Sequence, residues 1–212
     1  MDRVKVLVGD VAQEVWESYD VDSDLLTPAD SWSVELGSSN GELPGGIFPG
    51  ASVRVTVGDE PVMVGFIDDV DHVLDKHGHR FRLAGRDQAS VLLDCSAPIL
   101  NLRVVSLQDI AIKVLRPLGI RDVRINADNT RIRQKISVEP GDTAWSVLAN
   151  VAEANGLWAW FDPSGAFVIG GPDYSRPEVA SLVIRKSGGG NNVLSIFERQ
   201  SIVVVKSFRT PR

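Results

Sequence analysis

The sequence predicts a mainly β protein of the α+β class, in which antiparallel β-barrel modules accompany a small two-helix α+β middle domain. Over the first ninety residues, apolar and polar side chains alternate with a period of two, which is typical of strands with one buried face. Beyond residue 100 the apolar spacing becomes that of amphipathic helices. Hydrophobic residues make up 43% and charged residues 24% of the 212 residues, the composition of an ordinary folded protein.

The N-terminal region is expected to consist of short strands separated by turns. Strands are predicted at three segments in which valine, tryptophan or leucine alternates with polar residues: 4–8, 32–36 and 53–57. The clearest hairpin runs from Pro61 to Arg86, and Gly78 supplies the positive φ that its tight turn needs. Several short strands at this spacing predict a small antiparallel barrel or sandwich.

Two helices are expected in the middle of the chain. Apolar residues from Leu107 to Leu118 form one stripe of an amphipathic helix, with Ser106 as its N-cap and Gly119 at its end. A second helix follows Pro140-Gly141-Asp142, and Asp142 is the predicted N-cap. It should end at Gly156.

Further strands are expected around and after these helices. A basic strand pair is predicted at 123–126 and 134–138, and a hairpin at 157–161 and 166–169. The tail should hold strands at 182–185, 193–198 and 202–205. These elements divide the chain into a β-barrel module, an α+β middle domain and a β tail that would belong to an incomplete second barrel: 1–98, 99–178 and 179–212.

The charge is distributed unevenly along the chain. Residues 1–100 carry 7 Lys/Arg and 18 Asp/Glu, a balance of −11, whereas residues 101–212 carry 15 and 10, a balance of +5. Such a split indicates either two regions that face different neighbours or simply two solvated domains. The sequence has no run of about 18 apolar residues, so no membrane span is expected.

The residue types that usually form metal sites and disulfides are sparse. Cys95 is the single cysteine, so neither an internal disulfide nor a cysteine-rich zinc site is available. His77 and His79 flank the turn glycine of the predicted hairpin, where solvation alone explains them, and His72 has no correctly spaced third ligand with them. No metal or cofactor is therefore expected.

An acidic run lies on the first strand of the predicted hairpin. Alternation would place Asp69, Asp71 and Asp75 on one face and Asp68 on the other. The run lacks the glycine and the terminal glutamate of an EF-hand loop, which favours a solvated or partner-facing surface over a cation site.

The motifs of common enzymes are missing from the sequence. The glycine-rich pieces lack the Lys-Ser/Thr of a phosphate loop, and neither a Gly-x-Ser-x-Gly elbow nor a His-Glu-x-x-His helix occurs. The sequence nominates no catalytic residue, and the prediction is a protein that is not an enzyme.

A basic cluster extends from Arg121 to Lys135. It contains no interleaved aromatic residue and belongs to a protein of net charge −6, so an acidic protein surface is favoured over nucleic acid as its partner, and no sequence-specific nucleic-acid binding is expected. The candidate interface residues are three arginines and three aspartates: Arg121, Arg124, Arg133, Asp68, Asp69 and Asp71.

Several motifs resemble one family. Leu83–Ser96 contains Gly85-Arg86-Asp87 followed by Leu93-Asp94-Cys95, and the middle of the chain contains Val138–Ala152 followed by Gly156-Leu157-Trp158. In this order they resemble the baseplate hub proteins of contractile-tailed phages, of the Mu-like type, which are similar to the hub part of type VI secretion spike proteins.

The resemblance implies a structural protein of the virion, assembled in the cytoplasm of the bacterial host. Such hubs form homotrimeric rings that join the sixfold tail tube to the threefold central spike, so the tube and spike proteins are the expected partners. Family members are longer, which makes this chain a short hub or a fragment of one. The acidic N-terminal unit is expected to line or rim the ring, and the basic middle to contact an acidic neighbour.

A second interpretation starts from Pro140–Trp145, which resembles the opening of a LysM peptidoglycan-binding module. That module does not place a hairpin such as Trp158–Phe161 after its first helix. Trp145 is therefore predicted to be a core residue, and glycan binding by a tail-associated protein remains the alternative function.

Overall fold

The structure is a computed structural model of the 212-residue chain. It describes residues 4–9, 11–13, 16–25, 27–38, 41–43, 45–76, 78–99, 101–127, 133–172, 175, 177–178 and 180–193. The chain divides into two compact units, 1–172 and 173–212. The expected boundaries at residues 98 and 178 stay predictions.

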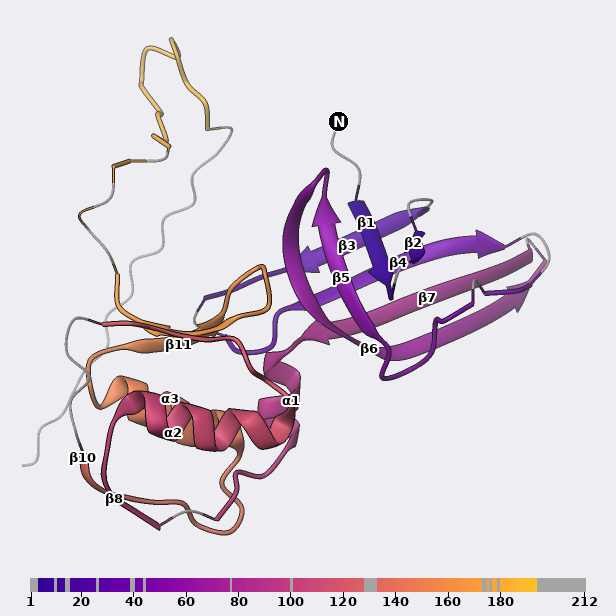
Figure 1. Ribbon diagram of the computed structural model, residues 1–212. Helices are drawn as coiled ribbons and strands as arrows, with labels where there is room; N and C mark the ends of the chain where they lie inside the picture. Colours follow the sequence, from indigo (N-terminus) through magenta and orange to yellow (C-terminus); the bar gives the residue numbers. More distant parts are fainter. Residues whose placement is uncertain are drawn as a thin grey trace, which may run out of the picture. The chain divides into compact units, whose positions relative to one another are not determined.

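Seven antiparallel strands form one sheet in the order β2-β1-β5-β6-β7-β4-β3. Their bounds are β1 (Val4–Val8), β2 (Val11–Gln13), β3 (Ser18–Asp22), β4 (Ser31–Ser38), β5 (Ser52–Val57), β6 (Glu60–Asp75) and β7 (Gly78–Asp87). The sheet curls into a half-barrel (Figure 1). The predicted mainly β class is confirmed, and among the described residues the sheet is open at β2 and β3.

The concave core of this sheet follows the alternation in the sequence. Alternate side chains are buried along β1 and over the first part of β4 and β5, including Val6, Val34 and Val55. They pack in one cluster with Met63 of β6 and Leu83 of β7. Only one face of the sheet is removed from water, so the apolar side chains on that face supply most of its hydrophobic stabilisation.

A β-bulge in β6 corrects the expected arrangement of the acidic run. Ile67 pairs with Gly85 of β7 and Asp69 pairs with Ala84, so Asp68 is an extra residue in the ladder. The bulge moves the buried face from odd to even positions, and Asp68 lies with Asp69 and Asp71 on the outer face. The prediction that Asp68 points away from Asp69 and Asp71 was wrong, because strict alternation ends at a bulge.

Three α-helices follow the sheet in the chain. They are α1 (Ala89–Asp94), α2 (Leu107–Leu115), which continues into the 3-10 turn η1 (Arg116–Leu118), and α3 (Ala144–Glu153). The predicted capping of α2 is confirmed: the Ser106 hydroxyl accepts from the Asp109 amide, and Gly119 ends η1 with φ of 84°. The short helix α1 is absent from the sequence prediction.

The N-cap predicted for α3 was wrong by one residue. Thr143 caps this helix, and its hydroxyl oxygen accepts from the Ser146 amide at 3.1 Å. The Asp142 carboxylate instead accepts from the Glu139 amide at 2.8 Å. Asp142 therefore closes the turn before the helix, because its side chain reaches backward along the chain.

Five strands complete the first unit: β8 (Asn101–Val105), β9 (Val123–Asn126), β10 (Arg133–Ser137), β11 (Trp158–Phe161) and β12 (Phe167–Gly170). The predicted hairpin β11–β12 is confirmed. The predicted pairing of the two basic strands is wrong: β9 pairs in parallel with β12, and β10 pairs with β8. Val123 and Ile125 of β9 pack against the helices, and this burial draws the strand to β12 instead.

The helices and the three-stranded sheet share a second core. Ile110, Leu115 and Leu148 are fully buried in it together with Phe167 and Ile169. The stripe residues of α2 therefore face this core, as their spacing predicts, and α3 contributes Val147, Leu148 and Val151.

The second unit lacks the first strand that the sequence predicts for the tail. Residues 182–185 are not a strand, because the side chains of Asn192 and Asn191 accept from the amides of Val183 and Arg185, both at 2.7 Å. Val193 is not in a strand either. The remainder of the predicted strand 193–198 and all of 202–205 lie outside the described residues.

Candidate functional site

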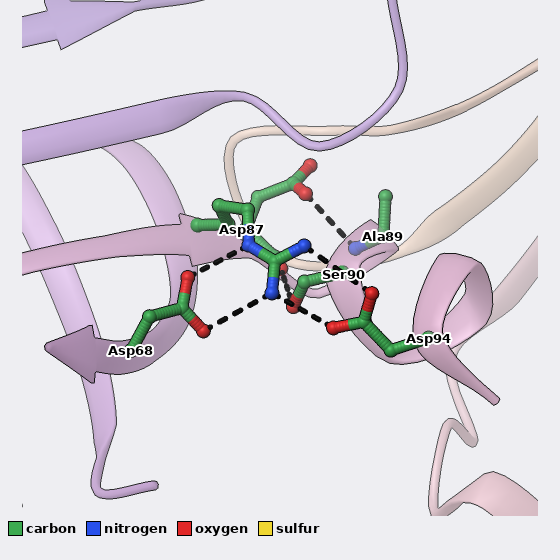
Figure 2. A network of polar contacts seen from close by, with 6 residues as sticks. Asp68, Asp87, Ala89, Ser90 and Asp94 are labelled. Atoms are coloured by element: carbon green, nitrogen blue, oxygen red, sulfur yellow. Dashed lines mark hydrogen bonds and ion pairs between the residues drawn. The ribbon is translucent and has the colours of Figure 1, made fainter. Parts of the chain in front are cut away.

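The Gly85-Arg86-Asp87 motif lies where the half-barrel sheet passes into α1 (Figure 2). A Cβ atom on Gly85 would lie 2.0 Å from the Phe66 carbonyl oxygen and 2.9 Å from the Trp32 indole. A Cβ on Gly65 would lie 2.0 Å from the Arg86 carbonyl oxygen. Only glycine permits this close approach of β6 and β7, which sets the position of the two residues that follow.

Arg86 connects β6 to α1 through two carboxylates (Figure 2). Its Nε donates to Asp68 Oδ2 at 2.7 Å and its Nη2 to Asp68 Oδ1 at 3.3 Å. Nη2 also donates to Asp94 Oδ2 at 2.8 Å. Hydrogen bonds to Asp68 and then Asp94 raise the pKa of Arg86, and the bond from Arg86 lowers the pKa of Asp94. The guanidinium therefore links α1 to β6 by charge-assisted hydrogen bonds.

Asp87 is buried beside this clamp and is only 7% exposed. Its Oδ1 accepts from the Ala89 amide at 2.9 Å, and its backbone carbonyl accepts from the Ser90 hydroxyl at 2.8 Å. Burial raises the pKa of Asp87 to about 7, and the charge of Asp30 adds to this increase, whereas the Ala89 amide and Arg86 oppose it. Asp87 thus supports the start of α1 while its carboxyl group stays largely desolvated.

Sequence reasoning identified Gly85-Arg86-Asp87 only as a motif and assigned it no role. The clamp depends on Asp68, which lies 18 residues before Arg86 and faces it only because of the bulge. The N-cap position of α1 is Gln88, and its side chain makes no capping hydrogen bond, so the sequence carried no capping signal for this helix.

The three predicted acidic interface residues differ in availability. Asp68 is occupied by Arg86. Asp69 and Asp71 are exposed on the outer face of β6, and neither forms an ion pair or a hydrogen bond within the described part of the chain. Asp71 lies beside Arg82 of β7, which in turn lies beside Glu35 of β4, so the outer face carries a charged row.

The predicted basic interface residues also separate. Arg121 is exposed and forms no ion pair with the described residues. Arg124 lies in β9 and donates to Asp122 at 2.9 Å and to Asp162 of the β11–β12 turn. Arg133 lies in β10, and its side chain is outside the description. Of these arginines, Arg124 has partners within the subunit, whereas Arg121 has no ion pair with the described residues.

Asp162 explains why Arg124 is held at the turn. Partial burial acts to raise its pKa, but bonds from the Ser164 hydroxyl, the Ala166 amide and the Arg124 charge lower it overall. The ionised carboxylate thus organises the β11–β12 turn and attracts the guanidinium of Arg124. This ion pair links β9 to a turn 38 residues later in the chain.

Two of the three histidines lie together near the tip of the β6–β7 hairpin. His72 Nε2 lies 2.9 Å from His79 Nδ1, and the His72 ring stacks on Phe81 with centroids 4.3 Å apart. His77 is outside the described residues. Within the described ranges, no three side chains of His, Cys, Asp or Glu come together as a metal site would require.

Trp145 belongs to the helical core, as predicted. It is half-buried and packs edge-to-face on Phe167, with ring centroids 6.5 Å apart. None of the described helices has the length and apolar character needed to cross a membrane.

Comparison with known families divides the first unit at the Arg86 clamp. Residues 3–87 match the N-terminal domain of the Mu phage baseplate assembly proteins of the GpP-like kind. Residues 89–171 match the second domain of the gp44-like baseplate hub proteins. This second match includes Pro140–Trp145, so the LysM alternative gains no support. No curated protein matches the sequence.

Solved structures of tail proteins share the fold. A tail protein from Neisseria meningitidis MC58 is 38% identical, with a TM-score of 0.78 over 89% of this chain and 56% of its own. The 43 kDa tail protein of prophage MuSo2 from Shewanella oneidensis is 24% identical, with a TM-score of 0.74 over 82% of this chain and 56% of its own. An E. coli component of the type VI secretion system is 15% identical, with a TM-score of 0.57 over 80% of this chain and 45% of its own.

The two domains follow each other in one chain, and the most similar of these three structures is itself a tail protein. The chain spans about 56% of the length of the two tail proteins. By its two domain matches the chain belongs to the phage baseplate hub proteins, with a Mu GpP-like first domain and a gp44-like second domain.

Proposed function

We propose that this chain is a hub component that forms a homotrimeric ring in the virion and joins the sixfold tail tube to the threefold central spike. The observation that carries the proposal is the Arg86 clamp, which links the two matched domains by ion pairs at their junction. An adaptor between a sixfold tube and a threefold spike needs a rigid joint between its domains, because a flexible linker would let the domains turn independently.

The half-barrel sheet supplies the means of association. Its order leaves β2 and β3 as edge strands among the described residues, with backbone groups on their outer sides. Open edges pair readily with further strands, whether from the rest of a longer hub or from another subunit. A ring in which each subunit covers its neighbour's edge would remove this exposure.

The charged residues without internal partners are assigned to the contacts with other proteins. Asp69 and Asp71 would face the lumen or the rim, where a negative surface does not retain passing DNA. Arg121 would contact an acidic neighbour. Asp68 and Arg124 contribute to the fold of the subunit itself, since each is held by an internal ion pair.

The mechanism is binding without catalysis, and the partners are a second and third copy, the tail tube protein and the spike protein. Assembly would take place in the bacterial host cytoplasm, and the ring would remain in the baseplate of the virion. No sequence-specific contact with nucleic acid and no membrane contact is part of this function.

Mass measurement tests the proposal directly. Light scattering and native mass spectrometry over a wide concentration range should give three times the 23.0 kDa subunit, either alone or after addition of the cognate spike protein. Electron microscopy of that species should show a ring. A subunit that stays monomeric at high concentration and binds neither spike nor tube protein contradicts the proposal.

A further inference from the structure

A cavity of about 200 Å³ opens in the first unit between the 23–30 loop and the β11–β12 hairpin. Asp30 and Asp87 line it together with the aromatic side chains of Trp145, Trp160 and Phe161. We call it the aspartate–tryptophan pocket. Its described lining residues include three aspartates, Asp24, Asp30 and Asp87, and no lysine or arginine.

The two carboxylates differ in the hydrogen bonds that they already accept. Both oxygens of Asp30 are used, by the Ser23 hydroxyl at 2.6 Å and the Asp24 amide at 2.9 Å. Asp87 uses Oδ1 for the Ala89 amide, whereas Oδ2 accepts no bond from the described residues. Because Asp87 is only 7% exposed and lines the pocket, this oxygen is an acceptor available to a ligand.

The nearest cation does not satisfy this oxygen. Arg86 is adjacent in sequence, but its guanidinium donates to Asp68 and Asp94 (Figure 2). Asp162, which lines the neighbouring smaller cavity with Asp87, is paired with Arg124. The described cations around Asp87 are therefore already engaged.

The aromatic lining favours a flat cation. Trp145, Trp160 and Phe161 are half-buried, so part of each ring is open to the cavity. A guanidinium stacks on an indole face and at the same time donates hydrogen bonds in its plane to a carboxylate. An ammonium group lacks this planar geometry, and an anion would be repelled by the aspartates.

We propose that the aspartate–tryptophan pocket binds an arginine side chain of a partner protein in the assembled baseplate. The inference rests on the proposed function for the identity of the partner, but the pocket belongs to the isolated subunit. The guanidinium donates to Asp87 Oδ2 and stacks on the tryptophans. Binding couples to protonation, because a guanidinium favours the ionised carboxylate and releases its proton.

The charged groups around Asp87 set the direction of that coupling. Asp30 and Asp24 come from the loop, Arg86 from β7 and Asp162 from the β11–β12 turn, whereas α3 contributes only uncharged side chains to the lining. With the pKa of Asp87 raised to about 7, mainly by burial, binding should strengthen as the pH rises from 6 to 8.

The test uses N-acetyl-arginine amide as the probe and its neutral analogue N-acetyl-citrulline amide as the matched control. The five tryptophan indole N–H signals are followed by NMR and assigned by single Trp→Phe substitutions. The arginine probe should shift the signals of Trp145 and Trp160, with an affinity at least threefold higher at pH 8 than at pH 6. N-acetyl-lysine amide should bind more weakly, and the citrulline probe should cause no shift.

Two variants connect the shifts to the pocket. Asp87→Asn keeps an acceptor for the Ala89 amide but removes the charge, and it should weaken binding at pH 8 at least tenfold. Trp160→Leu removes the stacking surface and gives an independent test if the first variant does not fold. Asp59→Asn, whose side chain is fully exposed, should bind as the wild type does.

Equal shifts with citrulline, unchanged binding by Asp87→Asn and Trp160→Leu, or tighter binding of the lysine probe would each overturn the proposal. If the subunit does not form a ring, the titrations can still be interpreted, because they measure binding of the probe to the isolated subunit. A subunit that forms rings but does not bind the arginine probe contradicts only the assignment of the pocket.

Discussion

Arg86 donates two hydrogen bonds to Asp68, Nε to Oδ2 at 2.7 Å and Nη2 to Oδ1 at 3.3 Å. This pairing exists because the bulge in β6 turns Asp68 toward the outer face of the sheet. The same guanidinium reaches Asp94 in α1. One side chain thus connects the two domains that the family comparisons recognise separately.

Replacement of Arg86 should loosen this connection. We expect Arg86→Ala to lower the free energy of unfolding by about 1 to 2 kcal/mol, which is the value of charge-assisted hydrogen bonds reduced for a side chain that is one-third exposed. Urea unfolding at neutral pH measures this change. Arg80→Ala is the control, because its pair with Asp75 is more exposed and should be worth less than about 0.5 kcal/mol.

An equal loss in the two variants would contradict the role of the clamp. A second measurement separates stability from rigidity: amide hydrogen exchange in α1 should increase in Arg86→Ala more than exchange in β1. If exchange increases evenly throughout the unit, the residue contributes to general stability without holding the two domains.

Gly85 should tolerate no side chain. A Cβ at this position would lie 2.0 Å from the Phe66 carbonyl oxygen, and backbone atoms of a paired strand cannot move away without breaking the ladder. We expect Gly85→Ala to destabilise the protein by about 3 kcal/mol or more, at the upper end of overpacking effects. Gly45→Ala, where a Cβ meets nothing within 4 Å, should change stability by less than about 0.5 kcal/mol. Similar thermal unfolding of the two variants would refute the steric argument.

The sequence predicts the elements of this fold better than their pairing. Alternation locates β4 and β5, and the apolar stripe with its Ser106 cap locates α2, because these signals are local. The parallel pairing of β9 with β12 has no local signal, since it depends on which apolar face the helices can cover.

The candidate site shows the same difference. Residue type and charge identify Asp68 and Arg124 as notable, but each has an internal partner that is far away in the chain, at Arg86 and Asp162. The alternation of side chains along a strand gives the wrong face for Asp68, because a single sequence does not show where a β-bulge lies. The aspartate–tryptophan pocket depends on the packing of the loop that ends at Asp30 against the hairpin that begins at Trp158, which no spacing rule predicts.

Asp87 should make stability depend on pH. Its folded pKa, about 7, lies above the ordinary value of an aspartate, so the neutral carboxyl stabilises the fold at low pH. This contribution is complete below the unfolded pKa of about 4 and is lost as the pH rises toward 7. Asp87→Asn stays neutral at every pH, so its stability relative to the wild type should increase between pH 5 and pH 8 by on the order of 2 kcal/mol.

Urea unfolding of both proteins at several pH values tests this expectation. Comparing the two cancels the opposite contributions of Asp94, Asp109 and Asp162, whose pKa values are lowered in the fold. A constant difference across the range would mean that Asp87 is ionised in the folded protein at pH 5.

The two arginines of the basic segment should respond differently to charge reversal. Arg121 has no ion pair among the described residues, so Arg121→Glu should leave the unfolding transition unchanged and weaken assembly with other subunits or the spike at least tenfold. Arg124→Glu should instead lower the unfolding transition, because it places three acidic side chains together at the β11–β12 turn with Asp122 and Asp162.

Circular dichroism melting and analytical ultracentrifugation distinguish the two effects within one set of samples. Arg133→Glu completes the series, since this strand residue belongs to the same predicted surface. If assembly survives reversal at Arg121 and Arg133 together, the basic segment does not contact an acidic neighbour. Association would then have to depend on the strand edges at β2 and β3, which a charge change in β9 or β10 does not touch.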